Sequence, residues 1–344
     1  MKVGLVGTGT IAEKNHLPVL LSIPDVDLVA VCDNNEKRLK RVADKFNIRN
    51  RYSTLTDMLQ SNEFEIIDIT TPGFTHYNLA KEALKSNVHV LVEKPVTLET
   101  SQAEDLMGES DSRNLKLGVC QAFRYSEPVM EFQNVRKNGG IGTIDRIITI
   151  QHGSSIFALP PWFWDENTSR GILYELAIHA IDLQCYLMGP SKGVLAININ
   201  YDKALKFTTS ILLTIQFESG LGVVDLKWLS SSSFLHQYIS GSVADAIIKF
   251  YPDSFVLQRG DFAPVSECKA EVKRLWNFGQ SAFRRKYYKK SEAPHRIMIE
   301  NFIQSVKTDR QPYVPIAEVI PTHRLLDEIW QKSRVLVNEQ IKNS

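Results

Sequence analysis

The sequence has almost no net charge and no long apolar run, and each absence excludes a class of protein. Its 40 Lys and Arg residues stand against 39 Asp and Glu residues, so the formal net charge is +1. A balance this even gives no electrostatic reason to expect nucleic acid or an anionic membrane as a partner. No uninterrupted apolar stretch approaches the roughly 20 residues that span a bilayer. The start MKVGLVGTG also lacks the apolar core of a signal peptide. We therefore expect a cytoplasmic protein.

Cysteine is also scarce. The four cysteines are Cys32, Cys120, Cys185 and Cys268, and no two of them form a C-x-x-C pair. This usage is typical of reduced cysteines in a cytosolic protein, and it predicts neither a disulfide framework nor a zinc site. We expect no metal centre.

The first 121 residues alternate short apolar runs with stretches of helical character. Strands that are apolar throughout are typical of a parallel sheet covered on both faces. The expected strands are Val3–Val6, Leu28–Cys32, Ile66–Ile69, Val88–Val92 and Lys116–Val119. The pattern predicts an α/β fold that begins with a Rossmann domain, a doubly wound parallel sheet, over residues 1–121.

The pattern changes near Phe123, and residues 122–344 are expected to form a second α/β domain. Several longer segments alternate apolar and polar residues, which is typical of an antiparallel sheet with one covered face. The expected strands are Ile144–Gln151, Val194–Tyr201, Phe207–Phe217, Leu221–Trp228 and Ala246–Phe250. We therefore expect a large, mostly antiparallel open sheet. The polar segment Gln258–Glu292 is expected to be a long loop.

A glycine turn follows the first strand and predicts a dinucleotide site. In Gly7-x-Gly9-x-x-Ala12, Gly7 permits a tight turn, Gly9 lets the backbone approach a pyrophosphate, and Ala12 allows close helix packing. The helix that starts at Thr10 and Ile11 then offers N–H donors and its positive dipole end to the anion.

The second strand ends at Asp33, which lies 21 residues beyond Ala12. A carboxylate in this place accepts hydrogen bonds from the ribose hydroxyls and repels a 2′-phosphate, which favours NAD over NADP. Lys37 and Arg38 follow closely and weaken that preference, so NADP stays possible.

Two groups of polar residues are candidates for chemistry. Lys94 directly follows an apolar strand, where the carboxyl ends of parallel strands place ligand-binding residues, and a lysine held there can exchange protons with a hydroxyl or carbonyl. Glu175 and His179 are four residues apart on an expected helix, so they share a face. Each also has a plainer interpretation: a surface lysine, and a histidine satisfied within the core.

These motifs together resemble the Gfo/Idh/MocA family, the glucose–fructose oxidoreductase and inositol dehydrogenase group, over nearly the whole chain. The resemblance is carried by the glycine turn, by Glu93-Lys94-Pro95, and by the string Glu175-Leu-Ala-Ile-His179-Ala-Ile-Asp182. The string is similar to the family's D-x-G-x-H-x-x-D.

The resemblance implies an enzyme that transfers hydride between a nicotinamide and a carbinol or carbonyl of a sugar, polyol or sugar derivative. It implies that Lys94, His179 and Glu175 are catalytic. Besides the glycine turn and Asp33, the implied cofactor-binding residues are Thr71, Pro72, His76, Glu93, Lys94 and Gln121. The expected substrate-binding residues are Lys94, Arg124, Trp164, Arg170, Glu175 and His179. It also implies sheet-to-sheet packing into a homodimer or homotetramer.

The chain departs from the family's pattern at two positions. Glu175 stands where the family usually has Asp, and Arg170 stands where it often has Gly. We interpret Arg170 as a reader of a substrate carboxylate or phosphate, with a salt bridge as the alternative. Trp164 either walls the pocket or packs in the core.

Two further functions stay open. The chain could be an enzyme that cycles a tightly bound NAD internally, or a dinucleotide-binding regulatory protein without catalysis. Neither the substrate nor the direction of the reaction follows from the sequence, because many chemistries share one fold.

Overall fold

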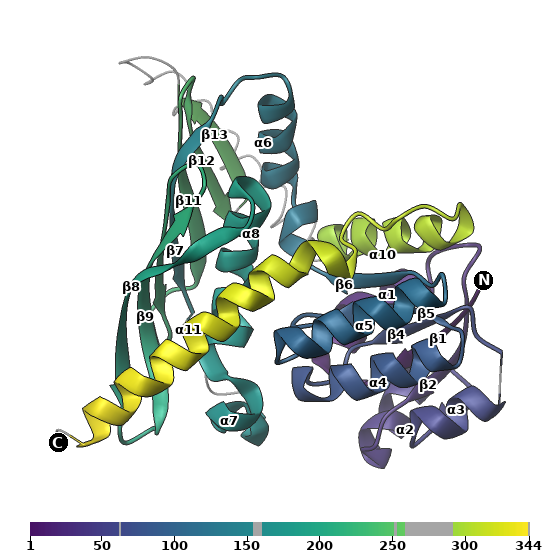
Figure 1. Ribbon diagram of the computed structural model, residues 1–344. Coiled ribbons are helices and arrows are strands. Elements are labelled where there is room, and N and C mark those ends of the chain that lie inside the picture. The colour runs from purple at the N-terminus through teal and green to yellow at the C-terminus, as the bar shows by residue number, and fades with distance from the viewer. Residues whose placement is uncertain (62, 154–159, 251–252, 259–291, 343–344) are drawn as a thin grey trace. The chain divides into compact units, whose positions relative to one another are not determined.

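The computed structural model describes residues 1–61, 63–153, 160–250, 253–258 and 292–342. The chain divides into two compact units, Met1–Ala122 with Ser291–Ile320, and Phe123–Lys290 with Pro321–Ser344 (Figure 1). The first boundary lies one residue from the expected one. The expected second domain, 122–344, is however not continuous, because the segment that ends at Ile320 packs with the first unit.

The first unit contains a six-stranded parallel sheet. Its strands run in the order β3-β2-β1-β4-β5-β6, which confirms the predicted Rossmann topology. They are β1 (Lys2–Val6), β2 (Asp27–Cys32), β3 (Asn50–Tyr52), β4 (Ile66–Ile69), β5 (His89–Glu93) and β6 (Leu117–Cys120). The direction of winding reverses between β1 and β4, so the carboxyl ends of these strands form the switch point where such sheets bind ligands.

Helices cover this sheet because their apolar residues fall on one side. They are η1 (Ala12–His16), α1 (Leu17–Leu20), α2 (Glu36–Lys45), α3 (Leu55–Ser61), α4 (Gly73–Lys85), α5 (Thr100–Ser112) and α10 (Glu292–Lys307). In α2, for example, Leu39, Val42 and Ala43 are buried at helical spacing, and the Asn35 side chain caps the helix by accepting from Arg38 N.

The segment that returns from the second half of the chain completes the β6 edge of this sheet. Val119 N donates to Val314 O at 3.0 Å, and the Phe302 ring of α10 packs so closely on Gly118 that no Cβ would fit there. Helix α10 also contacts η1 and α1. Because of these contacts, the segment Ser291–Ile320 belongs to the first unit, whereas we expected all residues after 121 to form the second domain.

The second unit contains a seven-stranded sheet with the order β13-β12-β11-β7-β10-β9-β8. Only the β7–β10 pair is parallel, which confirms the expected mostly antiparallel sheet. The strands are β7 (Ile144–His152), β8 (Ser191–Asp202), β9 (Phe207–Phe217), β10 (Leu221–Lys227), β11 (Phe234–Gly241), β12 (Asp245–Phe250) and β13 (Ser254–Gln258).

The described helices cover one face of this sheet and leave the other open. Helix α6 packs against β12 and β13, α8 packs against β7 and β10, and Figure 1 shows both on the same side. The helical elements are η2 (Ala122–Tyr125), α6 (Glu127–Lys137), η3 (Pro161–Trp164), α7 (Glu166–Ser169), η4 (Leu173–Ala177), α8 (Ile178–Met188) and α11 (Ile316–Lys342). The open face carries a row of neighbours across five strands, Thr214, Val223, Ile148, Tyr238 and Ile247.

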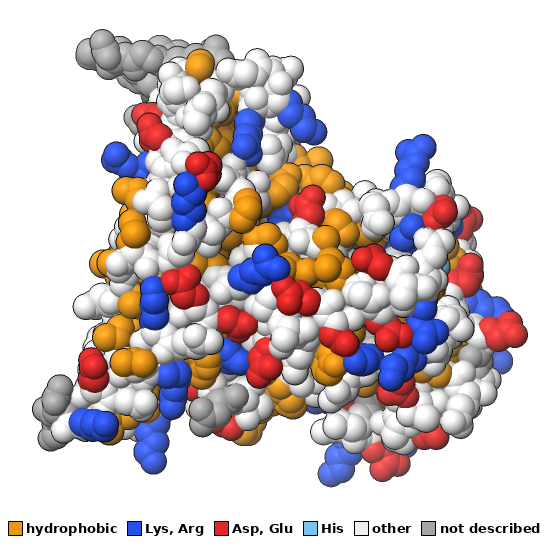
Figure 2. All heavy atoms as spheres, in the orientation of Figure 1, with side chains coloured by type: hydrophobic (Ala, Val, Ile, Leu, Met, Phe, Trp, Pro, Cys, Tyr) orange, Lys and Arg blue, Asp and Glu red, His pale blue; other side chains and the backbone are white. Residues whose placement is uncertain are grey.

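The surface carries charges of both signs. On the face drawn in Figure 2, acidic and basic side chains are interspersed. Within the described residues, no helix has both the length and the apolar character needed to cross a membrane. The expected loop Gln258–Glu292 lies almost entirely outside the described residues.

Candidate functional site

The two glycines of the turn differ in the space that surrounds them. Gly7 has φ +95°, and a Cβ there would lie 2.8 Å from the backbone of Thr70 and of Thr71, so the turn itself requires glycine. A Cβ on Gly9 would meet no atom within 4 Å. The fold therefore does not need glycine at position 9, whereas a pyrophosphate lying against the helix N-terminus does. The residues present fit a dinucleotide.

Asp33 lies at the end of β2 and is tightly held. Thr8 donates to its Oδ2 from N at 2.7 Å and from Oγ1 at 2.8 Å. Arg38 donates from Nε to Oδ2 at 2.8 Å and from Nη2 to Oδ1 at 2.7 Å. Burial alone would raise the pKa of Asp33, but hydrogen bonds from Arg38, Asn35 and Thr8 hold it below its ordinary value. The Asp33 carboxylate, which we expect to bind ribose, is thus already paired with the guanidinium of Arg38.

His76 ties two loops of the first unit together. Its buried ring nitrogens lie 2.6 Å from Pro95 O and 2.7 Å from Thr71 O. The loop Thr71-Pro72 is only partly buried, and Thr75 Oγ1 donates to Pro72 O. The structure therefore places the imidazole between two backbone carbonyls, and its contact with a cofactor stays a prediction.

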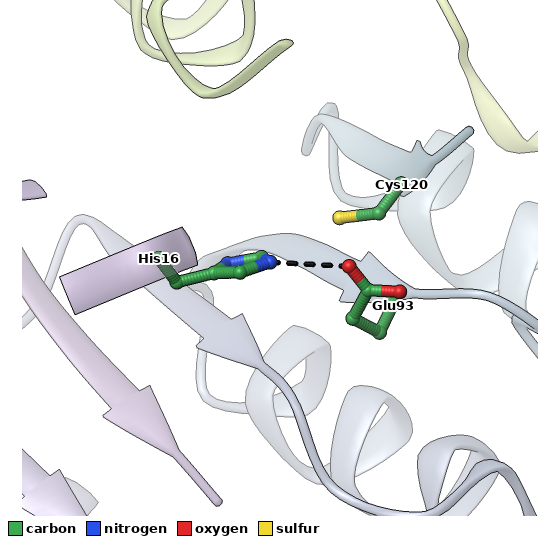
Figure 3. A group of neighbouring side chains, drawn as sticks. All are labelled: His16, Glu93 and Cys120. Carbon is green, nitrogen blue, oxygen red and sulfur yellow. Dashed lines mark hydrogen bonds and ion pairs between the residues drawn. The ribbon is translucent and has the colours of Figure 1, made fainter. Parts of the chain in front are cut away.

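The end of β5 carries a network of ionisable groups (Figure 3). Glu93 Oε2 accepts from Lys94 N at 3.1 Å, and Glu93 Oε1 lies 3.1 Å from His16 Nε2. On the other side of the imidazole, His16 Nδ1 lies 2.7 Å from Asp68 Oδ2. The Lys94–Pro95 peptide bond is cis. The structure thus places Lys94 next to a carboxylate that a buried histidine holds.

The charges of this network are mutually stabilised. Burial would lower the pKa of His16, but Asp68 and Glu93 raise it to about 10. Burial would likewise raise the pKa of Glu93, but the hydrogen bond and charge of His16 lower it to about 2. Cys120, at the end of β6, is buried beside them, and burial raises the pKa of its thiol well above its ordinary value. At neutral pH the imidazolium of His16 thus lies beside the carboxylate of Glu93 and the neutral thiol of Cys120.

Gln121, which follows β6, fits its expected place in the cofactor site. It is 2% exposed, and its Nε2 has no hydrogen-bond partner among the described residues. A buried donor of this kind is satisfied in nearly all structures, so a bound ligand is a natural partner for it.

In the second unit, Glu175 and His179 lie on one continuous helical stretch. Glu175 is within η4, a π-helical turn, and His179 is the second residue of α8. Both side chains are partly buried, and the ring of Phe123 meets His179 edge-on at 4.7 Å. Single π-helical turns inside α-helices are frequent at functional sites.

Arg124, which we expect to bind substrate, forms a buried ion pair. Its side chain is 1% exposed, and its Nε and Nη2 each donate to a carboxylate oxygen of Asp182 at 2.8 Å. The guanidinium also lies 4.6 Å from the centre of the Tyr186 ring. The last residue of the string that ends at Asp182 therefore forms a buried ion pair, and Arg124 joins η2 to α8.

Arg170 also forms internal contacts. Its Nη1 lies 3.4 Å from Asp327 Oδ1, and its guanidinium lies 5.4 Å and 5.2 Å from the ring centres of Tyr174 and Trp330. The structure favours the salt-bridge alternative over the reading of a substrate anion.

Trp164 packs in an aromatic cluster, with its ring 5.5 Å from that of Phe163 and 5.2 Å from that of Phe207. These contacts favour packing over a wall of the substrate pocket.

Sequence reasoning missed His16 and Asp68. Asp68 is the single charged residue within the apolar strand Ile66–Ile69, and it is 0% exposed. A buried carboxylate is almost never left without a partner, so the acid itself was the available signal. Nothing in the sequence identified His16 as that partner, because the two residues are 52 positions apart.

Two family models match the chain. Residues 1–121 match GFO_IDH_MocA, described as an oxidoreductase family with an NAD-binding Rossmann fold, and residues 129–243 match the GFO/IDH/MocA C-terminal domain. Together they span more than half of the chain.

The chain is also similar in sequence to individual dehydrogenases. D-apiose dehydrogenase of Paraburkholderia graminis is 25% identical over 231 residues, covering 67% of this chain and 61% of its own length. Myo-inositol 2-dehydrogenase of Thermotoga maritima is 25% identical over 232 residues, covering 65% of this chain and 68% of its own length. The first curated relatives are thus matched over slightly less than two thirds of their length.

Solved structures share the fold over nearly the whole chain. The WlbA dehydrogenase from Bordetella pertussis, crystallised with NADH and UDP-GlcNAcA, has a TM-score of 0.83 at 19% identity, covering 97% of this chain and 95% of that one. KijD10, a 3-ketoreductase from Actinomadura kijaniata crystallised with NADP and TDP-benzene, has a TM-score of 0.78 at 16% identity, covering 95% and 96%. The chain belongs to the GFO/IDH/MocA oxidoreductase family, with its NAD-binding Rossmann domain in residues 1–121.

Proposed function

We propose that this protein is an NAD(P)-dependent oxidoreductase that transfers hydride between the nicotinamide and a carbinol or carbonyl carbon of a sugar, polyol or sugar derivative. The observation that carries the proposal is the turn at Gly7 and Gly9. The backbone demands glycine at the first position, whereas only a ligand demands it at the second. The names of the relatives, D-apiose dehydrogenase and myo-inositol 2-dehydrogenase, support the substrate class.

The bound nicotinamide supplies the hydride acceptor or donor. In the proposal, His179 takes the hydroxyl proton of the substrate in the oxidative direction and returns it in the reductive direction. Lys94 assists proton transfer. Glu175 supports the imidazole of His179 from the preceding helical turn. Glu175 is one methylene longer than the aspartate usual in the family, so its carboxylate reaches farther from the helix backbone.

The first experiment measures cofactor binding. Purified protein is checked for cofactor carried through desalting and is then titrated with NADH and NADPH by fluorescence. Binding of either supports the proposal. Cofactor that survives desalting would favour an enzyme that cycles NAD internally, and the absence of both binding and retained cofactor would overturn the assignment.

The second experiment measures turnover on a panel of sugars, polyols and sugar acids. We expect Lys94→Ala and His179→Ala each to lower kcat at least about 100-fold, the usual contribution of a positioned acid or base, while NADH still binds. Lys85→Ala, at an exposed position at the end of α4, is the matched control and should leave kcat unchanged. Binding of NADH by wild type without turnover on any compound would favour the regulatory alternative.

We also propose a homodimer or homotetramer in the cytoplasm. The open face of the second sheet supports the assembly, since its row of neighbours includes Val223, Ile148 and Ile247. Apolar side chains on a sheet face that no described helix covers are typical of an interface.

A further inference from the structure

The imidazole of His16 lies between two buried carboxylates. The exposed fractions of the side chains are 0% for His16, 1% for Asp68 and 9% for Glu93. Each ring nitrogen is within hydrogen-bond distance of a carboxylate oxygen, Nδ1 of Asp68 Oδ2 and Nε2 of Glu93 Oε1. A neutral imidazole has a single N–H, so only the imidazolium donates to both. The geometry alone therefore indicates a protonated His16.

The other charged and titratable groups around this imidazole come from three further places. Cys120 lies at the end of β6, His295 of α10 meets the His16 ring edge-on at 5.9 Å, and the charge of Lys94 acts on Glu93. Among the described residues, Asp68 Oδ1 has no hydrogen-bond partner. The His16 ring is thus the hydrogen-bond partner that Asp68 and Glu93 share.

The three residues connect distant parts of the first unit. His16 ends η1, which follows directly from the glycine turn, whereas Asp68 belongs to β4 and Glu93 ends β5. Figure 3 shows the imidazole pointing from its helix toward the Glu93 carboxylate. The nucleotide-binding helix is thereby tied to the strand end from which Lys94 extends.

We propose that His16 is a positioning residue whose imidazolium holds the Glu93 carboxylate in place and ionised at the end of β5. It thereby fixes the backbone that carries Lys94. The inference rests on the proposed function, because it gives Glu93 and Lys94 their tasks beside a bound nicotinamide. In this arrangement, loss of the imidazolium removes the cation that lowers the pKa of Glu93, and burial then raises that pKa.

A metal ion is the rival explanation for this cluster. Single ligand atoms of His16, Glu93 and Cys120 all lie within 4.8 Å of one another. A metal needs a neutral imidazole nitrogen and a thiolate, however, because ligands bind in their deprotonated forms. Here both imidazole nitrogens face carboxylates, and burial keeps the Cys120 thiol protonated. The imidazole nitrogens and the thiol sulfur that would bind a metal therefore carry protons instead.

The first test uses the wild-type chain without cofactor and so does not depend on activity. In protein with ¹⁵N-labelled histidine, we expect the His16 ring to keep both nitrogens protonated from pH 6 to pH 9. The signal is assigned by its loss in His16→Gln. A His16 that is neutral at pH 8 would overturn the proposal. Stoichiometric zinc in the purified protein that is lost in His16→Gln would overturn it as well.

The second test measures NADH binding against pH. Wild type should show a nearly constant dissociation constant from pH 6 to pH 9. In His16→Gln we expect binding to weaken about 10-fold or more as the pH falls through this range, because the buried Glu93 carboxylate takes up a proton once His16 is absent. The double variant His16→Gln/Asp68→Asn removes one carboxylate, so its transition should move at least about one pH unit lower.

The control for this series is His89→Gln, at the opposite end of β5. His89 Nδ1 accepts from Lys116 N, away from the strand's carboxyl end, so this variant should keep the pH profile of wild type. A pH-independent loss of binding in His16→Gln that Asp68→Asn does not alter would show a merely structural role and overturn the proposal. Wild type that binds no NADH would instead contradict the proposed function, while the NMR result still decides the state of His16.

Discussion

Arg38 and Asp33 form the pair of residues that should set the choice between NADH and NADPH. Arg38 donates twice to Asp33, and its side chain is 42% exposed, so it can also meet a 2′-phosphate. We expect Arg38→Ala to weaken NADPH binding about 10-fold and NADH binding less than about 3-fold, since a charge-assisted hydrogen bond contributes roughly 1.5–3 kcal/mol.

Lys37→Ala is the matched control for this prediction, because Lys37 is the exposed neighbour on the same helix. It should leave the ratio of the two affinities unchanged. Equal losses for both cofactors in Arg38→Ala would show that Arg38 serves only to hold Asp33 in place.

His323 should make the second unit sensitive to mild acid. It is 1% exposed, and neither ring nitrogen has a hydrogen-bond partner among the described residues. Burial lowers its pKa to about 4. Between pH 6.5 and pH 4 the unfolded chain binds a proton that the folded chain does not, so stability falls as pH falls through this window, by up to about 3 kcal/mol.

Urea unfolding at pH 7.5 and pH 4.5 measures this effect in wild type and in His323→Leu. The variant should lose clearly less stability than wild type between the two pH values, because it has no imidazole to protonate. The same loss in both proteins would assign the acid sensitivity to other groups.

At the scale of the element, the turn between β1 and η1 contains two glycines with different tasks. We expect Gly7 to be required for folding and Gly9 to be required for cofactor binding. We expect Gly7→Ala to destabilise the protein by about 1–3 kcal/mol or more, through the positive φ and contact with the backbone of Thr70 and Thr71. Gly9→Ala should change stability by less than about 0.5 kcal/mol, yet weaken NADH binding at least about 10-fold.

Thermal unfolding and NADH titration of both variants test the distinction. Gly108→Ala, in helix α5 and with nothing within 4 Å of an added Cβ, is the control for a harmless glycine replacement. Unimpaired NADH binding by Gly9→Ala would remove the main support for a pyrophosphate at this turn.

Elements that are determined by neighbouring residues could be predicted from the sequence. Elements that depend on a partner far away in the sequence could not. The glycine turn and β5 were predictable because their residues are adjacent in sequence. Strand β11 was missed because polar residues interrupt its pattern, and Gln237 is buried only by pairing with Thr149, 88 positions away.

The candidate site divides in the same way. The sequence predicted the positions of Lys94 and His179 from motifs, and their roles stay predictions. It did not predict the ion pair of Arg124, because no pattern reveals that Asp182, 58 positions later, accepts from its Nε and Nη2. Long-range ion pairs are formed by the fold, so a single sequence contains no trace of them.

At the scale of the whole molecule, the open sheet face predicts an assembly. Tyr238, in the middle of that face, is 39% exposed and lies opposite Ile148 and Ile247 on the neighbouring strands. We expect wild type to sediment as a dimer or tetramer, and Tyr238→Glu to shift it toward monomer with an unchanged unfolding temperature, because the residue packs on no core.

Sedimentation velocity at several concentrations checks this prediction. Glu218→Gln, at an exposed turn between β9 and β10, is a suitable control for a surface change. A wild-type monomer at all concentrations would contradict the proposed assembly.

The β6 edge has a consequence for how the chain is made. During synthesis, residues 1–122 leave the ribosome long before α10, whose buried Met298, Ile299 and Phe302 belong to their unit. Until the whole second sheet has been translated, the nascent Rossmann sheet leaves β6 without Val314 and the apolar surface at Gly118 uncovered. An exposed strand edge beside apolar surface favours misassociation. The newborn first unit should therefore depend on chaperones until the C-terminal segment arrives.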